Sequence, residues 1–281
     1  MMVLYSLTVA VVLIAILLFI TVNSFKNPAP KNDKSPADEG IGYEEVLIPT
    51  KNKKKIYSWW IASGNSDVCV ILMHGWGKNA SLMMPYIKNL HAKGLNLIAF
   101  DSRNHGDSDK DGHSSMIKFA EDISACVDYI KANKKAESGR VYLIGLSIGG
   151  TASIYAASVD DRISKIVTVG APSNPADVMR KYLREKRIPN IMLRVVFKYL
   201  EFRVGKKFKE ICAAANIAKT KATVLLIHGT DDKLVPLEQA RLILGASNKN
   251  QAQLWEIPGK GHNNCHYEKG FWDRVLLFFE K

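Results

Sequence analysis

The sequence predicts an α/β protein with a mainly parallel sheet of eight strands and helices on both faces. Strand-like and helix-like segments alternate along most of the chain, which is typical of parallel sheets whose crossover connections are helices. Some strand-like segments, such as VCVILM at 68–73, are apolar throughout, as expected of strands that are covered on both faces. The length of 281 residues fits one domain of this class with an appended segment.

The elements follow in order along the chain. Eight segments have the apolar pattern of strands: 44–50, 55–63, 68–74, 95–100, 140–145, 165–170, 222–228 and 253–257. Five segments have a helical pattern: 80–93, 115–133, 148–158, 237–246 and 267–280. The stretch 174–221 lies between two strands and is too long for one crossover helix, so we expect a small helical cap over the sheet.

The first 25 residues carry no charged side chain. A helix over the apolar stretch 3–22 would be roughly 30 Å long, which matches the hydrocarbon core of a bilayer. A secretory signal would begin with basic residues and have a shorter apolar stretch. We therefore predict an uncleaved transmembrane anchor at 1–25, a polar tether at 26–42 and a folded domain at 43–281. Lysines after the anchor favour a cytoplasmic domain.

The net charge of +12 suggests acidic partners. Residues 178–209 alone hold eleven Lys or Arg residues and two Glu residues. This basic segment could be a solvated helical face, a contact with anionic lipid, or a site for acidic substrates. No nucleic-acid-binding module is recognisable. The four cysteines lack a C-x-x-C spacing, so we expect buried free thiols.

A single serine stands in the turn Gly145-Leu146-Ser147-Ile148-Gly149, between a strand and a helix. Such a turn reverses the chain sharply and leaves the serine exposed at the edge of the sheet. Glycines on both sides allow neighbouring backbone to come close. The context therefore indicates a nucleophile rather than a helix cap.

A serine nucleophile requires a base, and the base requires a carboxylate that orients it. Asp231 and Asp232 follow the strand at 222–228, and His262 follows the next strand. The order Ser, Asp, His is the one expected for this architecture. Acyl transfer also requires N–H donors for the developing oxyanion. The backbone N–H groups of Ile148 and Trp76 are the candidates.

These motifs together resemble the α/β-hydrolase superfamily, from about residue 43 to the end of the chain. The matching segments are HGWG (74–77), GLSIGG (145–150), HGTDDKLVP (228–236) and GKGH (259–262), in order and spacing. FDSRNHGDSD (100–109) also resembles a turn of the family, whose polar residues Asp101, Arg103 and His105 should brace the loops below the site. The family pattern favours Asp232 over Asp231 as the triad acid.

The resemblance implies hydrolysis of a carboxylic ester, thioester or amide without a metal or organic cofactor. We therefore expect a membrane-tethered, esterase- or lipase-like serine hydrolase with the triad Ser147, Asp232 and His262 and an ester or acyl-lipid substrate. Two alternatives remain: an aminopeptidase-like amide hydrolase and a non-catalytic binding protein on the same scaffold. His262, Cys265 and His266 match no strong metal-ligand pattern. The residues that would bind substrate are not identifiable from the sequence.

Overall fold

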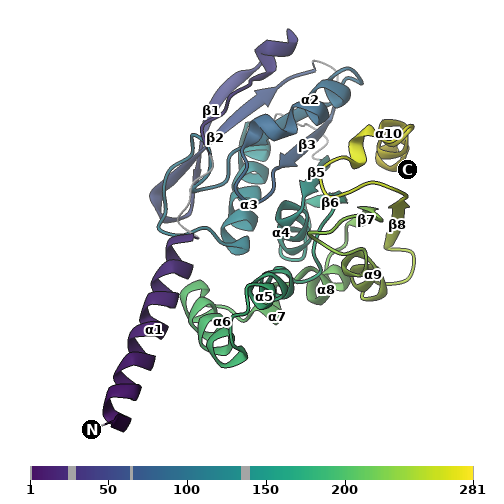
Figure 1. Ribbon diagram of the computed structural model, residues 1–281. Coiled ribbons are helices and arrows are strands. Elements are labelled where there is room, and N and C mark those ends of the chain that lie inside the picture. Colours follow the sequence, from purple (N-terminus) through teal and green to yellow (C-terminus); the bar gives the residue numbers. More distant parts are fainter. Residues whose placement is uncertain (1, 25–29, 64–65, 134–139, 281) are drawn as a thin grey trace.

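The computed structural model describes residues 2–24, 30–63, 66–133 and 140–280. Eight strands form one sheet in the order β1-β2-β4-β3-β5-β6-β7-β8 (Figure 1). β1 and β2 pair antiparallel, as do β2 and β4, and all later pairs are parallel. The predicted eight-stranded, mainly parallel sheet is confirmed. The strands are β1 (Glu44–Thr50), β2 (Lys54–Ile61), β3 (Val68–Met73), β4 (Asn96–Phe100), β5 (Arg140–Leu146), β6 (Ile163–Val169), β7 (Thr223–Gly229) and β8 (Ala252–Ile257).

Helices cover both faces of the sheet because its central strands are apolar on both faces. All six residues of β3 are buried, and alternate residues of the strand belong to different hydrophobic cores. One core contains residues of α3 (Met116–Ala132), α4 (Ile148–Ala157) and α9 (Glu238–Gly245). The other contains residues of α2 (Met84–His91) and α10 (Phe271–Glu280). The helices cover the faces of the sheet and not the carboxyl ends of its parallel strands, so a site can form at those ends.

Two predicted helices begin later than the sequence pattern suggested. The segment 80–93 divides into a short 3-10 helix, η3 (Ala80–Met83), and α2, which has Pro85 in its first turn. Proline is tolerated there because the first N–H groups of a helix have no partner within the helix. The segment 267–280 begins with the last residue of a 3-10 turn, η5 (Cys265–Tyr267). Its α-helix, α10, begins only after Gly270, which has a φ of +78°.

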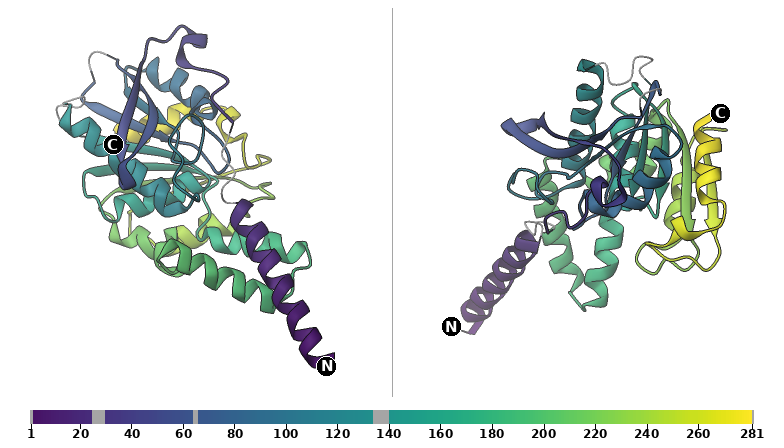
Figure 2. Two further views of the ribbon diagram at one scale, coloured as in Figure 1. Left: turned by 90° about the vertical axis from the view of Figure 1, so that its left-hand side faces the viewer. Right: turned by 90° about the horizontal axis from the view of Figure 1, so that it is seen from above.

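Four α-helices and a short 3-10 helix, η4 (Ile217–Lys219), lie between β6 and β7, in the stretch that was predicted to be the cap. The α-helices are α5 (Pro175–Glu185), α6 (Asn190–Val204), α7 (Phe208–Ile211) and α8 (Ala213–Asn216). Figures 1 and 2 show α5 and α6 projecting beyond the sheet on the side of the α4 N-terminus. A small core of their own, which includes Ala176, Leu193 and Phe197, holds α5 and α6 together.

The predicted membrane anchor is not supported by the structure. Residues 2–24 form α1 (Met2–Ser24), which projects beside α6 (Figures 1 and 2). Among the described residues, no helix combines the length and the apolar character that crossing a bilayer requires. Residues 25–29, at the join between the predicted anchor and tether, lie outside the described residues.

The described part of the predicted tether is hydrogen-bonded to the domain. The Asn32 side-chain amide donates to Asp101 Oδ2 at 2.6 Å, and its oxygen accepts the Ser81 backbone N–H at 3.0 Å. The Asn79 side chain donates to the carbonyls of Pro30 and Lys31, both at 3.0 Å. Residues 30–32 are therefore docked against the loop that leads from β3 into η3.

Candidate active site

Ser147 occupies a strained turn between β5 and α4. Its φ of 53° and ψ of −121° lie in a region that residues with a side chain rarely adopt. Such strain costs about 1–3 kcal/mol and persists only where the surroundings impose it. Here the Ser147 N–H donates to the Val169 carbonyl at 2.8 Å, and the Gly150 N–H donates to the Ser147 carbonyl at 2.9 Å. These bonds hold the turn between β6 and the first turn of α4.

The flanking glycines are required by close backbone contacts. A Cβ atom at Gly145 would lie 2.5 Å from the Gly149 carbonyl. A Cβ at Gly149 would lie 2.6 Å from the His74 carbonyl oxygen. Real Cβ atoms do not approach backbone so closely, so any larger residue would displace the helix that carries Ser147. This is the physical reason for the glycines that the sequence analysis noted.

His262 and Asp232 form a hydrogen-bonded pair at the same edge of the sheet. Asp232 follows β7 and His262 follows β8, and the two strands are parallel neighbours. His262 Nδ1 lies 2.6 Å from Asp232 Oδ2. The Asp232 side chain is fully buried, whereas that of His262 is 13% exposed. Asp231 is exposed and accepts a hydrogen bond from the Thr230 hydroxyl instead.

The surroundings of Asp232 favour its carboxylate form. Burial alone would raise its pKa, but hydrogen bonds from His228, His262 and the Val235 N–H hold the pKa well below its usual range. Oδ1 accepts the N–H groups of Leu234 at 3.0 Å and Val235 at 2.8 Å. Oδ2 lies 2.6 Å from His262 Nδ1 and 3.5 Å from His228 Nε2. A charged Asp232 keeps the proton of a neutral His262 on Nδ1 and leaves Nε2 as a base.

Ser147 and His262 line one cavity of about 1500 Å³, counted with the space that opens to solvent. Among the described residues, no hydrogen bond joins the Ser147 hydroxyl to His262, although both side chains face this cavity. Such bonds are often absent until substrate binds. The lining is mostly apolar, and none of its described residues is acidic: Gly75, Trp76, Lys78, Leu82, Tyr86, Leu146, Ser147, Ile148, Val169, Pro172, Pro175, Val178, Met179, Tyr182, Leu234, Val235, His262, Asn263 and His266.

The loop after β3 brings Trp76 beside the serine. A Cβ built on Gly75 would lie 3.4 Å from Ser147 Cβ, so this loop contacts the nucleophile turn. His74 Nε2 accepts the Ser102 N–H at 3.0 Å, which places the His74 proton on Nδ1, 2.7 Å from the Gly75 carbonyl oxygen. That carbonyl belongs to the same planar peptide as the Trp76 N–H, and the two groups point in opposite directions. His74 therefore sets the direction of the Trp76 N–H.

His74 performs this task as a neutral ring. Burial, with a smaller effect from the nearby His105, lowers its pKa to about 3, although the bond to Gly75 acts in the opposite direction. Ile148 is the first residue of α4, and the first N–H groups of a helix lack partners within the helix. The two predicted oxyanion donors thus flank Ser147, although their catalytic role stays a prediction.

A buried ionic network supports the loop that carries His74. Arg103 is fully buried and its Nε donates to Asp122 Oδ1 at 2.7 Å, with Asp111 and Glu121 as further partners. Asp122 Oδ2 accepts the Ser102 hydroxyl at 2.8 Å. The bracing role that was expected of Arg103 fits this geometry. Asp122 was missed, although a lone carboxylate on the apolar face of a helix, between Phe119 and Cys126, is a usable signal.

Three further predictions concern the cysteines, a possible metal site and the basic residues of the cap. All four cysteines are buried and unpaired. In the part of the chain that the structure describes, no three His, Cys, Asp or Glu side chains gather as a metal site. The basic cap residues Arg180, Lys181 and Arg184 line a shallow groove along α5, together with Asp177 and Glu185. Their contact with anionic lipid stays a prediction.

Comparisons with known proteins agree with this fold. A family model described as alpha/beta hydrolase fold matches residues 68–187. A solved esterase of Pyrococcus furiosus is 26% identical, with a TM-score of 0.74 over 90% of this chain and 96% of the esterase. The uncharacterized protein YfhR of Salmonella typhimurium is 24% identical over 99% of this chain and 94% of its own length. An uncharacterized membrane protein of Saccharomyces cerevisiae is 20% identical over 91% of this chain and 86% of its own length.

Proposed function

Because the chain has the α/β-hydrolase fold, we propose that it is a serine hydrolase that cleaves carboxylic esters or thioesters through Ser147, His262 and Asp232. One observation carries the proposal: the buried Asp232 carboxylate lies 2.6 Å from His262 Nδ1, at the cavity that the strained Ser147 also faces. Similarity to an esterase over nearly the whole chain supports it.

The proposed reaction uses these groups in sequence. Ser147 Oγ attacks the carbonyl carbon while His262 Nε2 takes the hydroxyl proton. The N–H groups of Ile148 and Trp76 stabilise the oxyanion, and the buried Asp232 stabilises the imidazolium. His262 then donates its proton to the leaving alcohol or thiol, and an acyl-Ser147 ester remains. Water, deprotonated by His262, hydrolyses this ester and restores the enzyme.

The lining of the cavity disfavours the aminopeptidase-like alternative. An aminopeptidase requires a negative group to hold the substrate ammonium, but the described lining has no carboxylate. Its basic side chains are Lys78, His262 and His266. A neutral or anionic substrate therefore suits the cavity better than a cationic one.

Labelling with a fluorophosphonate probe tests the proposal. The full chain should be labelled and should hydrolyse p-nitrophenyl butyrate. Ser147→Ala should show neither labelling nor hydrolysis. Ser158→Ala is the matched control, because Ser158 caps the C-terminus of the same helix and its hydroxyl donates to the Tyr155 carbonyl, away from the catalytic cavity. Folded protein without labelling would refute the proposal and favour a binding protein on this scaffold.

A further inference from the structure

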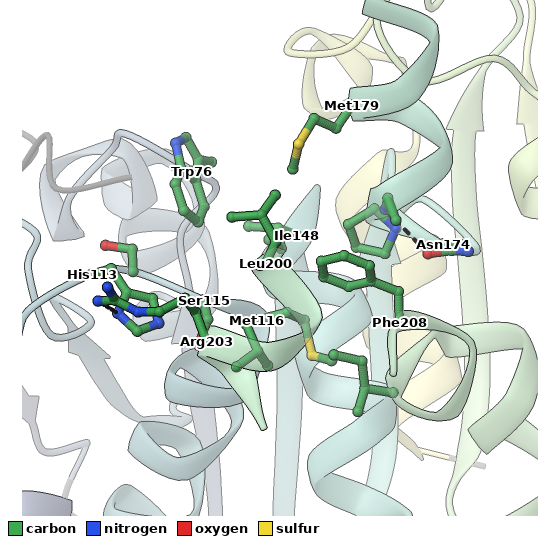
Figure 3. Close-up of a pocket in the computed structure, with 15 residues that line it drawn as sticks. Trp76, His113, Ser115, Met116, Ile148, Asn174, Met179, Leu200, Arg203 and Phe208 are labelled. Carbon is green, nitrogen blue, oxygen red and sulfur yellow. Dashed lines mark hydrogen bonds between the residues drawn. The ribbon is translucent and has the colours of Figure 1, made fainter. Parts of the chain in front are cut away.

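A second cavity lies beside the catalytic one, under the cap (Figure 3). About 700 Å³ of space lies between its side chains, including space that is open to solvent. Its residues come from five separate parts of the chain: Trp76, His113–Met116, Ile148, Asn174–Ala176 with Met179, and Leu200, Arg203, Val204, Phe208 and Ile211. Most of the side chains in Figure 3 are apolar, and we call this cavity the cap chamber.

Most polar side chains at the edge of the cap chamber have partners of their own, whereas the buried Ser114 hydroxyl has no hydrogen-bond partner among the described residues. Arg203 Nη2 lies 3.5 Å from His113 Nδ1, and Arg203 Nη1 donates to the Tyr199 hydroxyl at 3.2 Å. The Asn174 side chain accepts the Ala176 N–H at 3.1 Å and caps α5. These groups are occupied in binding the cap, so an apolar ligand would leave few polar groups unsatisfied in the cap chamber.

The cap chamber and the catalytic cavity share a wall next to the nucleophile. Trp76, Ile148, Pro175 and Met179 line both spaces. Ile148 directly follows Ser147, and in Figure 3 Trp76, Ile148 and Met179 lie around one end of the cap chamber. Trp76 and Ile148 also carry the proposed oxyanion donors. A substrate carbonyl bound to those donors would therefore lie where the two spaces meet.

The position of His262 decides which part of the substrate enters which space. The leaving group must receive a proton from His262 Nε2, so it must lie on the side of His262. His262 lines the catalytic cavity and is not among the residues that line the cap chamber. The acyl chain departs from the carbonyl in the other direction, toward the cap chamber.

We propose that the cap chamber binds the acyl chain of the substrate, and that the protein prefers esters or thioesters of unbranched, medium-length fatty acids to acetyl esters. The inference rests on the proposed function. Trp76, Ile148 and Met179 form the entrance, and Leu200, Val204 and Phe208 contact the chain. Each buried methylene should raise kcat/KM about fourfold, from about 0.8 kcal/mol of transfer free energy, until the cap chamber is full.

The test compares p-nitrophenyl acetate, butyrate and octanoate. Val204→Phe places a ring in the cap chamber from the last residue of α6, which does not line the catalytic cavity. We expect kcat/KM for octanoate to fall at least tenfold and that for acetate to change less than twofold. Val159→Phe makes the same change at a 68% exposed position and should alter neither rate. Leu200→Ala, which enlarges the cap chamber, should move the optimum to longer chains even if Val204→Phe fails to fold.

Binding to an inactive variant separates this inference from the proposed function. In Ser147→Ala, a dansyl-labelled undecanoic acid should bind, and addition of Val204→Phe should weaken its binding at least tenfold. If this holds while the unmodified chain hydrolyses no ester, the cap chamber binds acyl chains and the proposed function is wrong. If hydrolysis depends on Ser147 but chain length has no effect, or if Val204→Phe slows all three esters equally, the inference about the cap chamber is overturned.

Discussion

Replacing Asp232 by Asn removes one charge from the centre of the site and changes little in shape. The carboxamide oxygen can still accept the N–H groups of Leu234 and Val235, now at 3.0 and 2.8 Å from Oδ1. Its NH₂ group then takes the place of Oδ2, 2.6 Å from His262 Nδ1. An NH₂ donor there favours the His262 tautomer with its proton on Nε2. That tautomer cannot accept the Ser147 proton.

Asp232→Asn should affect both the rate of catalysis and the stability of the fold. With the wrong tautomer of His262, we expect kcat to fall about 10⁴-fold and KM to stay within about threefold. Two hydrogen bonds to a charged acceptor become bonds to a neutral one, at about 1 kcal/mol each. The unfavourable contact between the new NH₂ group and the His262 ring should add about 1 kcal/mol to this loss of stability. Asp232→Asn should therefore lower the free energy of unfolding at pH 7 by about 2–4 kcal/mol.

The assay is hydrolysis of p-nitrophenyl butyrate, with urea unfolding followed by circular dichroism. Asp231→Asn is the matched control, because Asp231 is exposed and should change activity less than twofold and stability by less than about 0.5 kcal/mol. More than a tenth of the original kcat in Asp232→Asn would refute the assignment of this carboxylate. Equal losses in the two variants would refute it as well.

Two further predictions concern stability. Burial raises the pKa of Asp101 from 3.8 to about 6, although hydrogen bonds act in the opposite direction. Protonation of Asp101 therefore stabilises the folded state fully below about pH 4, and this stabilisation is lost as the pH rises through 6. An asparagine at this position does not titrate. The free energy of unfolding of Asp101→Asn, measured in urea, should therefore rise by about 3 kcal/mol relative to that of the unmodified chain between pH 4 and pH 7. The same pH dependence in both proteins would contradict this. Gly149→Ala places Cβ 2.6 Å from the His74 carbonyl oxygen and should cost at least about 2 kcal/mol in thermal unfolding. Gly245→Ala, with no atom within 4 Å of its Cβ, should cost nothing, and equal effects of the two changes would show that the contact at Gly149 can relax.

The order and approximate bounds of the strands were predictable because they depend on local pattern. VCVILM is apolar at every position, and only burial on both faces of a sheet makes such a strand soluble. The strained turn at Ser147 was likewise predictable, since glycines at 145 and 149 are required by contacts within a few residues along the chain and with β3. Local chemistry of this kind is visible in a short window of sequence.

The supporting groups of the site were less predictable. Asp122 reads as a charged residue in an amphipathic helix, and only the packing of α3 under β4 shows that it binds Arg103 and Ser102. Asn32 reads as part of a polar linker, yet it bonds to Asp101, 69 positions away. The expected membrane anchor at 1–25 also shows that a local pattern can mislead. A window of apolar residues predicted a membrane span that the described structure does not support.

By itself, the sequence determined the class of the fold, the succession of strands along the chain and the candidates Ser147 and His262 for catalysis, because each depends on periodicity or on a motif of a few neighbouring positions. Tertiary structure decided that Asp232 rather than Asp231 meets His262, that His74 orients the peptide of Trp76, and that a cap chamber exists. The cap chamber is lined by segments near 76, 114, 148, 175 and 204. Their apolar residues have the same pattern as core residues, and only the way the cap packs on the sheet leaves a space between them.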